Sequence, residues 1–171
     1  YTESEGQTFN VKLHTTDLYI KADKNLHEEA YRILSSTRKE LEEYILKHDE
    51  FLHSLDPLTP HGDEPEIALS MIHASSIAGT GPMAAVAGAI AETVGRELLK
   101  YSTEVIVENG GDIWMKLAES SDIGLYADNF YFKNNVGIRI YPYDTPCSVC
   151  TSSSKLGHSI SFGRADSVTV V

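Results

Sequence analysis

The order in which hydrophobic patterns follow one another along the chain is the feature that most limits its fold. Apolar residues recur at helical spacing over residues 26–45 and 82–98, whereas the chain from Thr103 onward consists of short runs with β-strand character. A doubly wound parallel sheet would instead alternate strands with helices. The segregation therefore predicts an α+β fold with a mainly antiparallel sheet packed against long helices. A length of 171 residues suits one domain with its own core, so we predict a single domain over residues 1–171.

Two alternating runs near the N-terminus, residues 8–13 and 18–22, predict a β-hairpin. Asn25 is placed to cap the long helix that follows, with Glu28 as its reciprocal capping partner. Residues 48–66 are rich in proline and acidic side chains, which indicates a surface connection with one short helix. The second half contains seven predicted strands, at residues 103–107, 112–117, 123–127, 136–141, 148–151, 158–162 and 167–171.

Residues 67–91 carry no formal charge and form the only stretch that resembles a membrane segment. The stretch is broken at Gly79-Thr80-Gly81-Pro82, and alanine supplies most of its apolar content. We therefore predict two core helices, the second beginning at Pro82, and no membrane association.

Acidic side chains outnumber basic ones by 25 to 14, giving a formal net charge of −11. Such a chain repels polyanions, and its Lys and Arg residues are scattered, so nucleic acid is not an expected partner. The first residues lack the apolar run of a secretory signal, and Cys147 and Cys150 are the only cysteines. Cytoplasmic localisation is the resulting expectation.

The turn Gly79-Thr80-Gly81 precedes a helix and is a candidate anion site. Exposed N–H groups and the positive end of the helix dipole favour phosphate there. An ordinary glycine turn between two buried helices explains the same residues equally well. A dinucleotide-binding pattern is also loosely satisfied, but the residues before Gly79 look helical where that motif requires a strand.

A second candidate is the turn Glu108-Asn109-Gly110-Gly111-Asp112 between two predicted strands. Asn-Gly and Gly-Gly are favoured by tight hairpins, which is a sufficient structural reason for the central residues. The hairpin does not require the two carboxylates that flank it. Glu108 and Asp112 are predicted to bind ribose hydroxyls or a hard cation at one place.

A third candidate is the hydroxyl-rich segment that follows Cys150. Its predicted ligand-binding residues are Thr151, Ser152, Ser153 and His158. They would bind phosphate, or assemble a nucleophile and base with Cys150, although a polar loop accounts for them as well. Asp166 is either a metal ligand or a turn residue.

Metal sites built from cysteine or histidine are not expected. Cys147 and Cys150 form one C-x-x-C pair without a second, and an odd offset in a strand sends them to opposite faces. His61 and His73 lack the H-x-x-x-H spacing of a helical zinc site, so solvent exposure or core hydrogen bonding is the expectation for them.

Three blocks, at residues 78–92 (AGTGPMAAVAGAIAE), 105–115 (VIVENGGDIWM) and 150–171 (CTSSSKLGHSISFGRADSVTVV), together resemble a largely prokaryotic branch of the ApbE-like superfamily, named for FAD:protein FMN transferase. The resemblance implies an ApbE-type fold, a pocket for FAD, FMN or a related nucleotide, and Mg²⁺ on the diphosphate, with Asp112 and Asp166 near the metal. It also implies Mg²⁺-dependent phosphoanhydride cleavage or FMN transfer.

Two departures weaken the implied activity. Ser154 stands where the branch usually has glycine, and relatives continue past the last strand with a helix that supplies metal ligands. The expectation is therefore that this chain lacks a C-terminal segment or has lost the activity. Two alternatives from other classes stay open: a module that binds a metabolite without turnover, and a structural homodimer formed through exposed strand edges.

Overall fold

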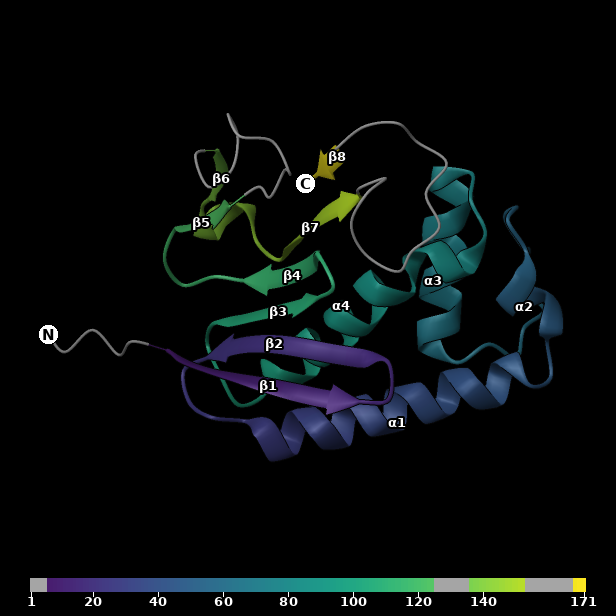
Figure 1. Ribbon diagram of the computed structural model, residues 1–171, viewed down its shortest axis with the longest axis horizontal. Helices are drawn as coiled ribbons and strands as arrows, with labels where there is room; N and C mark the ends of the chain where they lie inside the picture. Colours follow the sequence, from purple (N-terminus) through teal and green to yellow (C-terminus); the bar gives the residue numbers. More distant parts are fainter. Residues whose placement is uncertain (1–5, 125–135, 153–167) are drawn as a thin grey trace, which may run out of the picture.

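The computed structural model describes residues 6–124, 136–152 and 168–171, which form an α+β fold (Figure 1). The helical elements are α1 (His27–Ile45), α2 (Asp49–His53), α3 (Glu66–Ala78), the short 3-10 helices η1 (Pro82–Ala85) and η2 (Pro142–Asp144), and α4 (Val86–Leu98). The strands are β1 (Gln7–Leu13), β2 (Thr16–Ala22), β3 (Val105–Asn109), β4 (Asp112–Lys116), β5 (Ser121–Gly124), β6 (Gly137–Ile140), β7 (Cys147–Ser152) and β8 (Val168–Val170).

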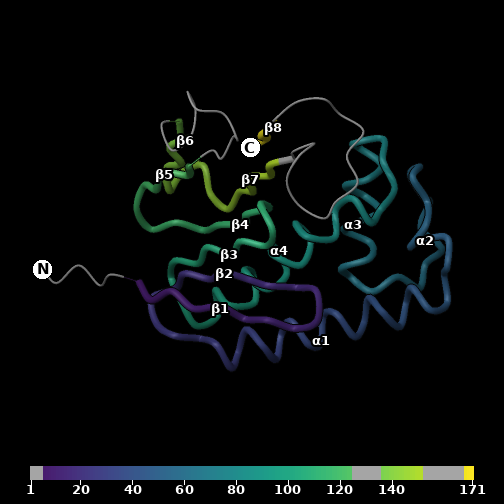
Figure 2. The backbone as a smooth tube through the Cα atoms, viewed as in Figure 1, coloured from purple at the N-terminus to yellow at the C-terminus, as the bar shows by residue number. Residues whose placement is uncertain are grey.

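The main sheet has six strands in the order β1-β2-β3-β4-β7-β8, and every neighbouring pair is antiparallel. The N-terminal hairpin lies beside β3, although α1, α2, α3 and α4 intervene in the sequence (Figure 2). The expectation of α+β layering with a mainly antiparallel sheet is therefore confirmed. Within the described part of the sheet, β1 and β8 are the edges, and dimerisation through such edges stays a prediction.

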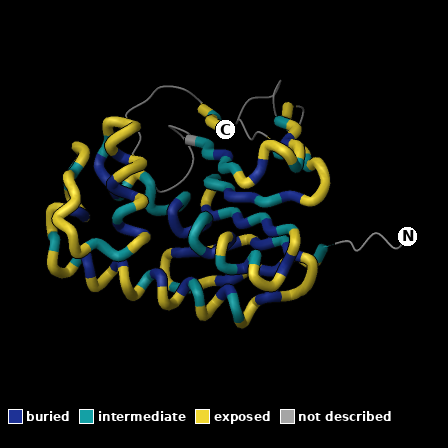
Figure 3. The backbone as a smooth tube through the Cα atoms, turned by 180° about the vertical axis from the view of Figure 1, so that it is seen from behind, coloured by how far each residue is buried: buried dark blue, intermediate teal, exposed yellow. Residues whose placement is uncertain are grey.

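Helices cover one face of this sheet. Helix α4 packs on β3 and β4, and α1 packs on β1 and α4. Buried and exposed residues alternate along α1 as its apolar stripe predicts (Figure 3). The main core lies between these helices and the sheet, where Leu18, Leu34, Val94 and Val107 are completely buried.

A smaller apolar cluster lies on the other face of β4 and β7. Met115 and Val149 are buried there together with Leu117 and Ile140. The hairpin of β5 and β6 contributes to this cluster through Ile123 and Ile138. Because side chains alternate along a strand, β4 and β7 present their other side chains to the helices.

Most element predictions are confirmed, including the N-terminal hairpin, the short helix between α1 and α3, and the helix break before Pro82. The predicted strand at residues 103–107 is shifted to Val105–Asn109. The predicted strand at 158–162 and most of that at 123–127 lie outside the described residues.

The predicted cap of α1 is wrong in detail. The N-cap residue is Leu26, not Asn25, and it makes no side-chain capping bond. Asn25 Oδ1 instead accepts a hydrogen bond from the His27 N–H at 2.9 Å, while the Asn25 N–H donates to Gln7 Oε1. Local turn formation and contact with β1 therefore displace the helix start by one residue.

No individual helix of the described segments is long and apolar enough to cross a membrane. Taken together, α3 and residues 82–98 would be long and apolar enough, by length and composition only. The two segments are bent by 105° at the Gly79–Gly81 break.

Candidate functional site

The turn between β3 and β4 is a two-residue hairpin in which Asn109 pairs with Asp112. Gly110 and Gly111 occupy the turn with φ values of 62° and 101°, where residues with a side chain are strained. A Cβ added at Gly110 would meet no heavy atom of the described residues within 4 Å. The turn therefore needs glycine for its backbone conformation, and no described residue fills the space over Gly110.

Asn109 and Asp112 both point toward the first turn of α4. Asn109 Nδ2 donates to the Ala87 carbonyl at 3.0 Å, which fixes the hairpin against the helix. An added Cβ on Gly88 would stand 3.8 Å from Asp112 Oδ2, so the carboxylate and the helix backbone are close neighbours. The positive end of the α4 dipole thus meets the negative charge of Asp112.

Asp112 is half-buried, and burial raises the pKa of its carboxyl group. Interactions with the Cys150 thiol and the Gly88 N–H act in the opposite direction and lower that pKa, without offsetting the effect of burial. Among the described residues, no lysine, arginine or histidine forms an ion pair with Asp112. A partly desolvated carboxylate therefore lies at this turn without a protein cation beside it.

Cys150 pairs with Asp112 across β4 and β7. Burial, followed by the charge of Asp112 and hydrogen bonding to it, raises the pKa of the Cys150 thiol to about 11. A thiol with such a pKa is almost entirely protonated at neutral pH and is a poor nucleophile. The predicted use of Cys150 as a nucleophile is therefore not supported by its surroundings.

Glu108 lies on the other face of the sheet from Asp112. It pairs with Ile113, which packs in the small cluster opposite the helices. The two carboxylates flank one turn, but they do not converge on one side of it, because β3 and β4 each alternate their side chains. The expectation that both would bind the same ligand is corrected here.

Thr151 is joined to the glycine turn through its backbone, since its N–H donates to the Gly111 carbonyl at 3.2 Å. Its hydroxyl lies 3.1 Å from that of Thr169. Ser152 is the last residue of β7, the strand that also carries Thr151. The other candidates from this segment, Ser153, His158 and Asp166, lie outside the described residues.

The turn Gly79-Thr80-Gly81 ends α3 and allows the chain after α2 to pack closely against it. The N–H groups of Gly79 and Thr80 both donate to the Ser75 carbonyl at the end of α3. A Cβ added at Gly81 would lie 1.8 Å from the Ser54 carbonyl oxygen, so the glycine permits close contact with the chain after α2. The described contacts do not bring this turn to Asp112, and they favour the ordinary glycine turn.

Sequence reasoning missed two features. Ala87 and Gly88 contact the hairpin, and only the packing of α4 on β3 and β4 reveals this. His48, Glu50 and His61 form a group whose ligand atoms lie within 4.8 Å of one another. His48 and Glu50 are two residues apart in the sequence, but His61 lies in the irregular connection between α2 and α3, so no single helix or strand pattern relates the three.

A family model described as AbpE bacteria matches residues 2–171. The UPF0280 protein of Methanocaldococcus jannaschii is 44% identical over 158 residues, which cover 91% of this chain and 64% of the relative. UPF0280 proteins of Methanobrevibacter smithii and Methanopyrus kandleri are 42% and 39% identical, over 95% of this chain and 68% and 66% of their own lengths. The chain thus spans about two thirds of these relatives, and somewhat less of the first.

These comparisons overturn the resemblance inferred from the three sequence blocks. The matching family is AbpE bacteria and the relatives are archaeal UPF0280 proteins, with nothing that relates them to the ApbE-like superfamily or to FAD:protein FMN transferase. Short blocks rich in glycine, serine and threonine recur in unrelated ligand-binding turns, which explains how they suggested the wrong family.

Proposed function

This chain belongs to the AbpE bacteria family, and from the chemistry around Asp112 we propose that it binds a nucleotide diphosphate, a flavin nucleotide such as FAD in the first instance, through a divalent cation. The observation that carries the proposal is the half-buried Asp112 carboxylate, whose pKa is raised by burial. A divalent cation would supply the positive charge that this carboxylate lacks in the described part of the chain.

The donor chemistry of the site fits Mg²⁺. A carboxylate oxygen is a hard ligand, and Mg²⁺ is commonly held by one or two carboxylates while it keeps several waters and contacts phosphate. Asp112 supplies one such oxygen ligand from the turn. The second predicted ligand, Asp166, stays a prediction because it lies outside the described residues.

Net charge gives a second reason for a cation-dependent ligand. With a formal charge of −11, the protein repels a free diphosphate over most of its surface. A bound Mg²⁺ would neutralise charge on the diphosphate and on Asp112 together. Affinity for the nucleotide is therefore expected to depend on Mg²⁺.

Backbone groups beside Asp112 would complete the site. The described part of the chain leaves the space over Gly110 unfilled, and the first turn of α4 presents the positive end of its dipole toward Asp112. Asn109 fixes this geometry through its bond to Ala87. The amides of Gly79 and Thr80 are not assigned to phosphate, since they already cap α3.

Cleavage of the bound diphosphate is part of the proposal as a distinct step. Attack of water on the phosphoanhydride of FAD would break one P–O bond, yield FMN and AMP, and release protons to solvent. Cys150 takes no role in this step, because its high pKa keeps it protonated. Binding without AMP release would identify a metabolite-binding module.

The test measures FAD binding through the quenching of flavin fluorescence, once with Mg²⁺ and once with excess chelator. Asp112→Asn is expected to abolish the Mg²⁺ dependence and weaken binding. Glu108→Gln is the matched control, since this carboxylate flanks the same turn on the other face. Chromatography of the same mixtures for AMP separates turnover from binding. Absence of saturable FAD or ADP binding in the presence of Mg²⁺, or an equal effect of the two variants, would reject the proposal.

A further inference from the structure

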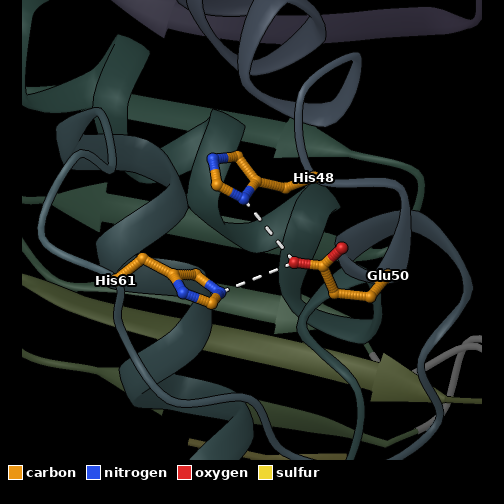
Figure 4. A group of neighbouring side chains, drawn as sticks. All are labelled: His48, Glu50 and His61. Atoms are coloured by element: carbon orange, nitrogen blue, oxygen red, sulfur yellow. Dashed lines mark ion pairs between the residues drawn. The ribbon is translucent and has the colours of Figure 1, made fainter.

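His48, Glu50 and His61 meet at the surface beside α2, far from the glycine turn in the sequence (Figure 4). His48 immediately precedes α2, Glu50 lies in the first turn of that helix, and His61 lies in the connection to α3. His48 Nδ1 is 3.6 Å from Glu50 Oε1, and His61 Nε2 is 3.5 Å from the same oxygen. Two imidazole nitrogens thus face one carboxylate oxygen.

These separations are long for hydrogen bonds, since an N–H···O bond has its donor and acceptor about 2.7–3.2 Å apart. Separations of this size also suit atoms that share a metal ion. Tetrahedral Zn²⁺ with bonds of about 2.0–2.1 Å places neighbouring ligand atoms about 3.4 Å apart. We propose that His48, Glu50 and His61 bind one divalent transition-metal ion, with Zn²⁺ as the first ion to test.

The surroundings of His48 hold its ring in the orientation that such a site needs. Asp63 Oδ2 lies 3.3 Å from His48 Nε2, the nitrogen that faces away from Glu50. A carboxylate at that position favours the tautomer with hydrogen on Nε2 and leaves Nδ1 free to bind metal. The Tyr44 ring stacks on His48 with centroids 4.3 Å apart, and only 17% of the His48 side chain is exposed.

The loop that carries His61 is also fixed by a carboxylate. Glu64 accepts hydrogen bonds from the N–H groups of His61 and Gly62, the latter at 2.9 Å. The Tyr44 hydroxyl donates to the same Glu64 side chain at 3.3 Å. Tyr44 therefore links the supports of the two histidines, so the His48 ring and the His61 backbone are placed before any ion binds.

Charge around the cluster favours a cation. Three carboxylates gather here: Glu50 between the two histidines, Asp63 at His48 and Glu64 at the His61 N–H. A ligand set of two histidines and one glutamate is typical of Zn²⁺ sites that keep a fourth position for water.

The experiment measures metal binding by the protein after removal of any affinity tag and of adventitious metal. Co²⁺ is the first probe, because tetrahedral Co²⁺ absorbs in the visible range, and displacement by Zn²⁺ then gives the Zn²⁺ affinity. We expect one equivalent of Co²⁺ to bind with a tetrahedral spectrum. His61→Ala is expected to weaken binding by at least about 100-fold, and Asp63→Asn by about 10–100-fold through the loss of the support for His48.

His53→Ala is the matched control, since His53 also belongs to the α2 region but its side chain is 67% exposed and faces Asp49 at 3.6 Å. It should bind metal as the unmodified protein does. Asp112→Asn should also keep full Zn²⁺ affinity, which separates this site from the proposed nucleotide site. His61 is itself 53% exposed, so its variant should fold, as the melting temperature will verify.

Three outcomes would overturn the metal site: no saturable Co²⁺ or Zn²⁺ binding, unchanged affinity in a folded His61→Ala variant, or an equal loss in His53→Ala. Any of them would assign the three side chains to a surface ion-pair group. Failure of nucleotide binding alone would leave this inference unaffected.

Discussion

The Asp112 carboxylate lies against Gly88 in the first turn of α4, so a charged side chain of the hairpin meets the positive end of a helix dipole. The contact does not overcome burial, because the pKa of Asp112 is still raised. In the absence of a cation, the site therefore favours the protonated carboxyl more than water does. This preference predicts that the charge of Asp112 lowers the stability of the fold at neutral pH.

Replacing Asp112 by Asn should raise the melting temperature at neutral pH in the absence of divalent ions. A carboxyl whose pKa is higher in the folded state contributes most to stability at low pH, and that contribution is lost as pH rises through the folded pKa. The increase in melting temperature caused by Asp112→Asn should therefore grow from about pH 4 upward and then become constant. Melting curves from pH 3 to 8 measure it, and a lower melting temperature of the variant at pH 7 would contradict the argument.

Cys150 should react slowly with iodoacetamide at pH 8. Its pKa of about 11, against 9.0 for an unperturbed thiol, makes the reactive thiolate about 100-fold scarcer than in a free thiol. Because the charge of Asp112 is one cause of the shift, Asp112→Asn should speed alkylation. Mass spectrometry of timed samples follows the modification, with denatured protein as the reference. Modification at the denatured rate would show that Cys150 is neither buried nor perturbed.

The sequence predicts much of the hairpin site. The residues Asn-Gly-Gly-Asp require a two-residue turn, and that turn forces Asn109 opposite Asp112. Carrying the alternation one residue further already places Glu108 on the other face. The register alone therefore separates the Glu108 side chain from that of Asp112.

Other features depend on tertiary packing that no local pattern reveals. The N–H groups of Gly79 and Thr80 already donate to a carbonyl at the end of α3. The Ser54 backbone, from a different segment, approaches so closely that position 81 must be glycine. The meeting of His61 with His48 requires the chain after α2 to fold back on the start of that helix. Spacing rules for helices and strands do not cover ligands brought together by an irregular connection.

Two glycines of α4 should respond to alanine with opposite signs. A Cβ at Gly95 would stand 2.1 Å from Cε3 of the buried Trp114 ring, whereas at Gly88 the nearest atom is 3.8 Å away. Gly95→Ala should therefore destabilise the protein by about 1–3 kcal/mol through overpacking. Gly88→Ala should stabilise it by about 0.5–1 kcal/mol, because alanine is the better helix former.

Urea denaturation of both α4 variants measures this difference, and Gly88→Ala serves as the internal control for helix propensity. Stabilisation by both substitutions would mean that Trp114 moves away from α4 at little cost.

Glu64→Gln should destabilise the protein at neutral pH, and the difference should shrink as the solution is acidified. Hydrogen bonds from the His61 N–H, and then from Gly62 and Tyr44, hold the pKa of Glu64 at about 2, against an ordinary value of 4.5. A lowered carboxyl pKa contributes stability that is complete above the unfolded value and is lost as pH falls through the folded one. The gap between the two proteins should therefore be constant above about pH 5 and close between pH 4.5 and 2.

Glu66→Gln is a suitable control for the Glu64 experiment, since Glu66 is exposed and begins α3 two residues later. Thermal melts of the three proteins across this pH range give the comparison. A gap between Glu64→Gln and the unmodified protein that stays constant down to pH 2 would show that the Glu64 charge does not hold the His61 loop. The support proposed for the metal site would then have to come from Tyr44 and Asp63 alone.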